Sequence, residues 1–267
     1  MDRINPPPEP AVEGRKRIPG PVRAADLELG KLAVLLDFDG TLVELKPTPQ
    51  EVQVPPSLKH TLSRLHDRLG GALCLVSGRP LADLDLFFDP LRLPIIGGHG
   101  AENRLTPNGV VNHAKVEPLD PELRRRLLAI ATGVEGILTE SKEYSVALHY
   151  RLVPELERMI FGEITRICSA WPPEAIELLP GKSVFEIKPS AFSKGLAVRE
   201  LMLHPPFAGR RPVFIGDDVT DESVLAVLPE FDGLGFSVGR ELNGAQGMFA
   251  TPREVRHWLY ELMRGGR

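Results

Sequence analysis

The chain has 267 residues, of which 42% are hydrophobic and 25% are charged, a globular composition with room for one large domain or two small ones. A formal net charge of -4 gives no electrostatic footprint for nucleic acid, and no apolar run reaches the roughly 20 residues that span a membrane. Cys74 and Cys168 lie in apolar surroundings, and the proline-rich, charged N-terminus lacks the apolar core of a signal peptide. We therefore expect a cytoplasmic protein with no nucleic-acid or membrane partner. Its oligomeric state is open, with a monomer assumed.

The first part of the chain predicts strands that alternate with helices. Residues 1–28 are rich in Pro, Glu and Arg and predict a flexible tail. Short apolar runs predict buried strands at Leu32–Leu36, Ala72–Val76 and Ile95–Ile96, and helical spacing of leucines predicts helices at Ser57–Leu69 and Leu81–Phe88. This alternation indicates a parallel sheet with right-handed crossovers.

The pattern changes between about 110 and 188. Thr106-Pro107-Asn108-Gly109 predicts a turn within a hairpin, and Asp120-Pro121 predicts the start of a helix that runs to about Ala131. A strand is expected over Glu143–Leu152 and a long helix from Pro154 to about Ala170. Ala175–Leu179 and Lys182–Lys188 predict a strand pair about Pro180-Gly181. These features indicate a small α+β insert.

The first pattern then returns. We expect a helix over Ser193–Leu203, a strand at Pro212–Ile215, a short helix at Val224–Leu228, a strand at Leu234–Val238 and a closing helix over Pro252–Met263. The predicted fold class is α/β: a doubly wound parallel-sheet, Rossmann-like core over 29–109 and 189–267, with an inserted α+β cap domain over 110–188.

Carboxylates follow the first strand. Asp37 and Asp39 are two residues apart, so they point to one side of the extended chain, and Gly40 and Thr41 turn the backbone away. Two acids this close require either a shared proton or a bound cation. Both alternatives suit phosphoryl transfer, in which one Asp attacks and the other carries a proton.

Other polar residues lie at strand ends and helix starts of the same predicted core. Asp217, Asp218 and Asp221 follow an apolar strand, and such an acidic cluster indicates Mg²⁺. Asp37, Asp217 and the Asp39 carbonyl are the expected direct ligands, with Asp218 and Asp221 in support through water.

Two further residues are expected at the phosphate. Lys194 supplies a fixed positive charge beside Asp37, and Ser77 donates a hydrogen bond to a phosphoryl oxygen or caps the next helix. Arg79 either reaches the substrate or pairs with a nearby acid.

Four motifs together resemble the haloacid dehalogenase superfamily of phosphatases: Asp37-Phe38-Asp39-Gly40-Thr41, Ser77, Lys194, and Gly216-Asp217-Asp218 with Asp221. The resemblance covers nearly everything after the tail. It implies a doubly wound core, a phosphoaspartyl intermediate at Asp37, Asp39 as acid and base, and Mg²⁺.

Within that superfamily the chain resembles the trehalose-6-phosphate phosphatases. The stretches that carry this are Ser77-Gly78-Arg79, Gly98-His99-Gly100-Ala101-Glu102, Glu140-Ser141-Lys142, His149-Tyr150-Arg151 and Gly181-Lys182-Ser183-Val184-Phe185-Glu186. The resemblance implies that Glu140, Lys182 and Glu186 hold the sugar, and that Gly78 and Arg79 belong to the substrate site. The implied substrate is the small molecule trehalose 6-phosphate, in trehalose biosynthesis.

Strand alternation supports this independently of the resemblance. Lys182, Val184, Glu186 and Lys188 would share one face of the strand, and Phe185 and Ile187 the other. The alternatives are a phosphatase for sucrose phosphate or a mannosyl phosphate, a phospho-receiver signalling module, and a catalytically silent sugar-binding protein.

Overall fold

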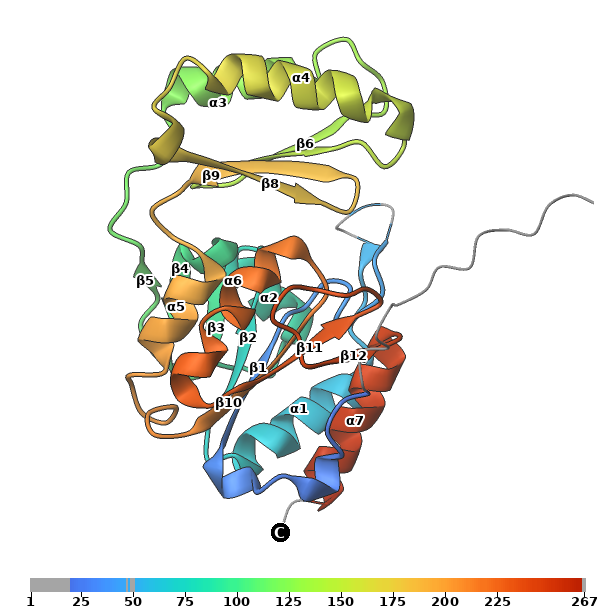
Figure 1. Cartoon of the computed structure of the whole chain (residues 1–267), viewed down its shortest axis with the longest axis vertical. Helices are drawn as coiled ribbons and strands as arrows, with labels where there is room; N and C mark the ends of the chain where they lie inside the picture. Colours follow the sequence, from blue (N-terminus) through green and yellow to red (C-terminus); the bar gives the residue numbers. More distant parts are fainter. Residues whose placement is uncertain (1–19, 47, 49–50, 266–267) are drawn as a thin grey trace, which may run out of the picture.

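The structure, a computed structural model, describes residues 20–46, 48 and 51–265, which form two β-sheets with flanking helices (Figure 1). The α-helices of these residues are α1 (Pro56–Arg68), α2 (Leu81–Phe88), α3 (Pro121–Ala129), α4 (Glu157–Cys168), α5 (Lys194–Leu201), α6 (Glu222–Leu225) and α7 (Pro252–Gly265). The strands of the larger sheet are β1 (Leu32–Leu36), β2 (Leu73–Val76), β3 (Ile95–Gly97), β4 (Glu102–Arg104), β5 (Asn112–His113), β10 (Arg211–Gly216), β11 (Leu234–Val238) and β12 (Gly247–Phe249). The strands of the smaller sheet are β6 (Leu138–Ser141), β7 (Val146–His149), β8 (Ile176–Gly181) and β9 (Val184–Pro189).

The larger sheet, which we call the core sheet, has the order β12-β11-β10-β1-β2-β3-β4-β5. Its strands from β12 to β3 are parallel, and β4 and β5 add an antiparallel hairpin at one edge. The strands β1 and β10 are neighbours, and the chain winds away from them in opposite directions. The carboxyl ends of β1 and β10 therefore flank a topological switch point, where open α/β sheets bind ligands.

Apolar side chains cover both faces of the core sheet, as expected for buried parallel strands. Figure 1 shows α1 and α7 together on one side of this sheet and α5 and α6 on the other. The closing helix predicted over Pro252–Met263 is confirmed as α7, and its residues Val255, Leu259 and Leu262 are fully buried.

The described end of the predicted tail also packs on the core. Ala24 and Leu27 are buried, and the indole Nε1 of Trp258 donates to the carbonyl of Val22 at 2.8 Å. Residues 1–19, 47, 49–50 and 266–267 lie outside the described residues, and most of the predicted flexible tail is among them. Among the described helices, none has the length and apolar character needed to cross a bilayer.

The smaller sheet has the antiparallel order β6-β7-β9-β8, and α3 and α4 cover its face away from the core (Figure 1). We call β6–β9 with α3 and α4 the insert. Leucines and isoleucines of both helices pack with Phe185 and Ile187, as the strand alternation predicted. The predicted start of α3 is confirmed, since the Asp120 carboxylate accepts from the backbone N–H groups of Glu122 and Leu123.

The structure corrects three local predictions. The strand predicted over Glu143–Leu152 is only Val146–His149, and it pairs with the edge strand β6. No periodicity predicted β6, because its residues are mostly exposed and carry no alternation. The turn between β8 and β9 is Lys182-Ser183, because Gly181 still pairs with Val184. Lys182 therefore lies at the hairpin tip and not within the strand. The short parallel edge strand β12 was also missed.

Candidate active site

Three carboxylates meet where β1 and β10 end. Asp37 directly follows β1, Asp217 follows β10, and Asp221 lies in the short 3-10 helix Val219–Asp221. One carboxylate oxygen from each residue lies within 4.8 Å of the other two, and all three residues are buried. The ammonium Nζ of Lys194 joins the group, at 2.8 Å from Asp37 Oδ1 and 2.7 Å from Asp221 Oδ1. Lys194 thus pairs with two of the three acids, and the third, Asp217, pairs with Lys182, so two lysines face three acids.

The surplus negative charge perturbs the acids. Burial raises the pKa of the Asp37 carboxyl well above its usual value, and the charges of Asp221 and Asp217 raise it further against the opposing effect of Lys194. Burial likewise raises the pKa of Asp217 to about 6, although Lys182 lowers it. A divalent cation would remove this repulsion, and carboxylate oxygens are the donors that hard cations prefer. The donor set therefore fits a metal ion.

Gly40 keeps the space beside the three carboxylates open. Gly40 has a φ of +77°, and a Cβ built on it would lie 2.2 Å from Asp217 Oδ2. A side chain at position 40 would push into the carboxylate cluster. The turn after Asp39 therefore needs glycine for its backbone conformation and for the space beside Asp217.

Asp39 and Arg79 form a further ion pair beside the three carboxylates. The guanidinium of Arg79 donates from Nε and Nη2 to the two carboxylate oxygens of Asp39 at 2.6 and 2.9 Å. Arg79 also lies 4.9 Å over the ring of Phe87. Arg79 thus pairs with a nearby acid and also lines the pocket described next, so that its reach to the substrate stays a prediction. Ser77 is not the helix N-cap, since α2 begins after Pro80. Its Oγ accepts from the Arg79 N–H at 3.1 Å.

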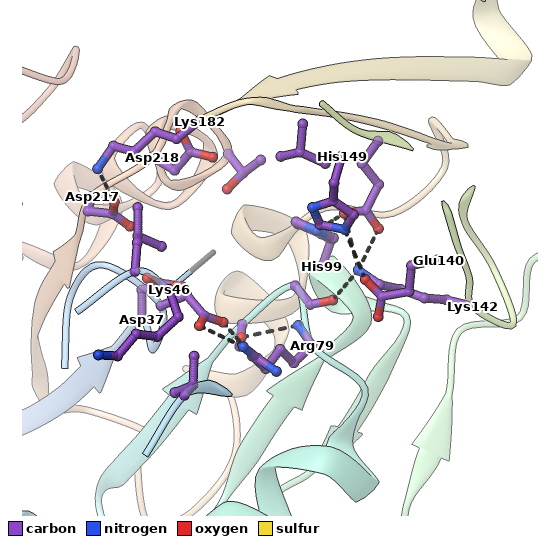
Figure 2. A pocket seen from close by; sticks show the side chains of 18 of the residues that line it. Asp37, Lys46, Arg79, His99, Glu140, Lys142, His149, Lys182, Asp217 and Asp218 are labelled. Atoms are coloured by element: carbon purple, nitrogen blue, oxygen red, sulfur yellow. Dashed lines mark hydrogen bonds and ion pairs between the residues drawn. The ribbon is translucent and has the colours of Figure 1, made fainter. Parts of the chain in front are cut away.

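The insert covers these core residues. A single pocket is lined from the core by Asp37, Asp39, Ser77, Gly78, Arg79, Lys194, Asp217 and Asp218, and from the insert by Glu140, Lys182 and Glu186 among others. Figure 2 shows Lys182 reaching Asp217 on one side of the pocket and Glu140, Lys142 and His149 gathered on the other. Every candidate site residue predicted from the sequence lines this pocket except Asp221, which is fully buried behind it.

Asp221 and Asp218 take different positions. The Asp221 carboxylate accepts from the backbone N–H groups of Asp217 and Asp218 at 2.9 and 3.0 Å, so it fixes the turn that presents Asp217. Asp218 stands outside the three-carboxylate group and pairs with Arg240.

Glu186 is the centre of a buried polar network in the insert. Its Oε1 accepts from Ser145 Oγ at 2.5 Å and from Lys142 Nζ at 3.0 Å, and its Oε2 contacts His99 Nε2 at 2.9 Å. Burial alone would raise the pKa of Glu186, but the charges of His99 and Lys142 and the hydrogen bonds outweigh burial and hold the pKa well below its usual value. Glu140 lies 3.4 Å from His149 Nε2.

Sequence reasoning assigned no role to several lining residues. Lys142, His149 and Arg151 come from the insert, and His99 comes from the core. Lys142 had a usable signal, because it stands two residues after Glu140 and shares its side of an extended chain. His99 had a weaker one, as a histidine enclosed by glycines after a buried strand.

Comparisons with known proteins first define the class. A haloacid dehalogenase-like hydrolase from B. subtilis superposes with a TM-score of 0.60 at 18% identity, over 88% of this chain and 99% of that chain. The C-terminal domain of trehalose-6-phosphate phosphatase from C. albicans superposes with a TM-score of 0.82 at 20% identity, over 94% of this chain and 99% of that chain. The predicted fold class, a Rossmann-like haloacid dehalogenase core with an inserted α+β cap, is confirmed.

Sequence similarity then gives the family. The family model for trehalose-phosphatase matches residues 35–249. A protein of Sinorhizobium fredii named "Probable trehalose-phosphate phosphatase" is 42% identical, and the alignment covers 86% of each chain. The trehalose-6-phosphate phosphatase of Escherichia coli is 38% identical, over 86% of this chain and 85% of its own. The chain belongs to the trehalose-phosphatase family.

Proposed function

We propose that this protein hydrolyses trehalose 6-phosphate to trehalose and phosphate, with Mg²⁺ and through a phosphoaspartyl intermediate at Asp37. The observation that carries the proposal is the placement of Asp37. Its carboxylate lies at the switch point beside Lys194, in a pocket whose opposite wall is a set of charged side chains from the insert. Family membership supports the same activity.

The residues around Asp37 suit a phosphate dianion. Asp37 and Asp217, with the Asp39 carbonyl, would hold Mg²⁺, and Asp221 fixes the turn that presents Asp217. When bound, the ion neutralises phosphate charge that would otherwise repel the attacking carboxylate. Lys194 holds Asp37 in place, and Ser77, which follows β2 and lines the pocket, would donate its hydroxyl to a phosphoryl oxygen.

The proposed reaction has two halves. An Asp37 oxygen attacks phosphorus, the bond from phosphorus to the trehalose oxygen breaks, and a proton on Asp39 passes to that oxygen. Asp39 then takes a proton from water as the water attacks the phosphoaspartate, which releases phosphate and restores Asp37. In this structure both Asp39 oxygens accept from Arg79, so one of these two contacts would open when Asp39 carries its proton.

The insert supplies the selectivity. The core chemistry would serve any phosphomonoester, whereas a disaccharide needs donors and acceptors at its hydroxyl groups. Glu140, Lys182 and Glu186 offer them from the insert, and we propose that the stretch from about 110 to 188 moves as a cap that closes over the bound sugar. Localisation in the cytoplasm and the monomeric state remain predictions.

Phosphate release from a panel of sugar phosphates, with Mg²⁺ or with chelator, tests the function. Trehalose 6-phosphate should give the highest kcat/KM, and chelation should abolish turnover until Mg²⁺ is restored. Calcium should restore turnover poorly, because it prefers a larger and looser oxygen shell. If sucrose phosphate or a mannosyl phosphate gave a higher kcat/KM, that sugar phosphate would be the substrate in place of trehalose 6-phosphate. Full turnover after exhaustive chelation would show that the reaction needs no Mg²⁺. A phosphoryl group that stays on the protein for minutes would favour the alternative of a phospho-receiver signalling module.

A further inference from the structure

The Glu186 carboxylate is held from both sides of the interface between core and insert. Ser145 and Lys142 belong to the insert and contact the carboxylate at 2.5, 3.0 and 3.2 Å, and His99 belongs to the core and contacts it at 2.9 Å. An ionised carboxylate offers roughly four acceptor positions. Three donor groups therefore hold the carboxylate, which leaves about one acceptor position for a substrate hydroxyl. The contact with His99 joins residues 87 apart in the sequence.

The backbone around His99 is shaped to present its ring. His99 lies in the 3-10 helix Gly98–Gly100 with φ 57° and ψ 25°, a left-handed conformation that is uncommon for a residue with a side chain. Its N–H donates to the carbonyl of Ser77 at 3.0 Å. A Cβ built on Gly78 would lie 2.2 Å from His99 Nε2, so the imidazole fits only against a glycine.

The ring depends on Glu186 for its orientation. His99 and Glu186 are 8% and 7% exposed. Within the described part of the chain, the second ring nitrogen Nδ1 is buried without a hydrogen-bond partner. The contact with Glu186 is therefore the side-chain hydrogen bond that fixes the imidazole, and it exists only while the insert lies against the core.

Lys142 also joins the insert to the core beside the contact between His99 and Glu186. Its Nζ donates to Glu186 and, at 3.1 Å, to the backbone carbonyl of Gly78 in the core. Figure 2 places His99, Lys142 and Glu140 on the side of the pocket away from Asp217. The contact between His99 and Glu186 thus fixes the positions of the side chains on the side of the pocket that remains for the sugar.

We propose that His99 is a positioning residue for substrate selection, because its hydrogen bond to Glu186 clasps the insert to the core and sets Glu186 and Lys142 over the sugar. The inference rests on the proposed function and deepens it by assigning the selection of the sugar to a core residue that touches no reacting atom. A small aryl phosphate does not use the insert, so its hydrolysis does not depend on the clasp.

Two variants whose side chains do not reach Glu186, and one conservative variant, test the clasp. His99→Asn and His99→Gly both accept the left-handed backbone, which guards against misfolding, and neither reaches Glu186. Each should raise KM for trehalose 6-phosphate about 10- to 100-fold, the usual effect of losing a buried hydrogen bond to a charged group. Their kcat for trehalose 6-phosphate and their kcat/KM for the aryl phosphate should change less than about threefold. His99→Gln retains an N–H near the Nε2 position and should recover most of the loss.

Ser145→Ala is the matched control, since it removes a donor to the same carboxylate from within the insert and leaves the clasp in place. Its KM for trehalose 6-phosphate should rise several-fold less than that of His99→Asn. Equal rises in KM for the two variants would show that His99 is only one more hydrogen-bond donor to Glu186. The proposal that it holds the insert to the core would then be wrong. Equal losses on both substrates, or no change in His99→Asn and His99→Gly, would also overturn it. A wild-type protein that does not hydrolyse trehalose 6-phosphate would instead overturn the proposed function, so the two failures are distinguishable.

Discussion

Lys194→Met tests the electrostatics of the carboxylate group. The side chain of Lys194 is 3% exposed, and its Nζ makes ion pairs of 2.8 and 2.7 Å with Asp37 and Asp221. Met fills a similar volume without the charge. Removing one partner of a buried ion pair typically costs about 3–5 kcal/mol, because the remaining charge is left uncompensated. We expect a loss of that size in the free energy of unfolding of the metal-free protein, together with loss of phosphatase activity.

Mg²⁺ should reverse much of this loss. The variant has the same carboxylates with one positive charge fewer, so it should attract the cation more strongly than the wild type does. An ion at 100 times its dissociation constant stabilises the folded state by about 2.7 kcal/mol. The stabilisation by Mg²⁺ should therefore be larger in Lys194→Met than in the wild type. Urea unfolding at matched ionic strength, with chelator or with Mg²⁺, measures the difference.

A second buried lysine provides the matched control. Lys188 is 1% exposed, and its Nζ is held by the carbonyls of Pro189 and Phe192 and by Glu177, away from the three carboxylates. Lys188→Met should also destabilise the protein, but Mg²⁺ should stabilise it no more than it stabilises the wild type. If Mg²⁺ rescues both variants equally, or neither, the reasoning about the carboxylate group is refuted.

Three further changes have definite expected outcomes. Gly40→Ala should abolish measurable turnover, because the new Cβ would stand 2.2 Å from Asp217 Oδ2, and a phosphate-release assay checks this against retained secondary structure by circular dichroism. Asp39→Asn should slow hydrolysis of trehalose 6-phosphate about 100- to 10,000-fold, and less for an aryl phosphate whose leaving group needs no proton, as steady-state kinetics on both would show. Glu186 has a folded-state pKa below the ordinary 4.5, so the unfolded chain binds more protons in the range just below pH 4.5. The stability that Glu186 contributes is therefore complete above that pH and is lost as the pH falls, and the stability difference between wild type and Glu186→Gln should shrink in unfolding experiments between pH 6 and 3.

The core was predictable because its signals are local. A run such as Leu32–Leu36 is apolar at every position since both faces of the strand are buried, and the acids that follow it can be found from sequence order alone. The strand order of a doubly wound sheet then brings Asp37 and Asp217 together at one edge. No further information is needed to expect an acidic site there.

The contacts between core and insert were not predictable in the same way. Glu186 and His99 are 87 residues apart, and no periodicity in either stretch points to the other. The position of Lys182 depended on where a hairpin turns, and a two-residue shift of the turn moved it from a strand face to the hairpin tip. The edge strand Leu138–Ser141 is mostly exposed and lacks the alternation that reveals a half-buried strand.

The most direct test of the account is the behaviour of Asp37→Asn towards trehalose 6-phosphate in the presence of Mg²⁺. The substitution keeps the shape of the side chain and removes the attacking charge. The variant should bind trehalose 6-phosphate in a calorimetric titration, with a dissociation constant no weaker than the KM of the wild type, and it should release no phosphate above background. Phosphate release at a rate comparable to that of the wild type would contradict the assignment of Asp37 as the nucleophile.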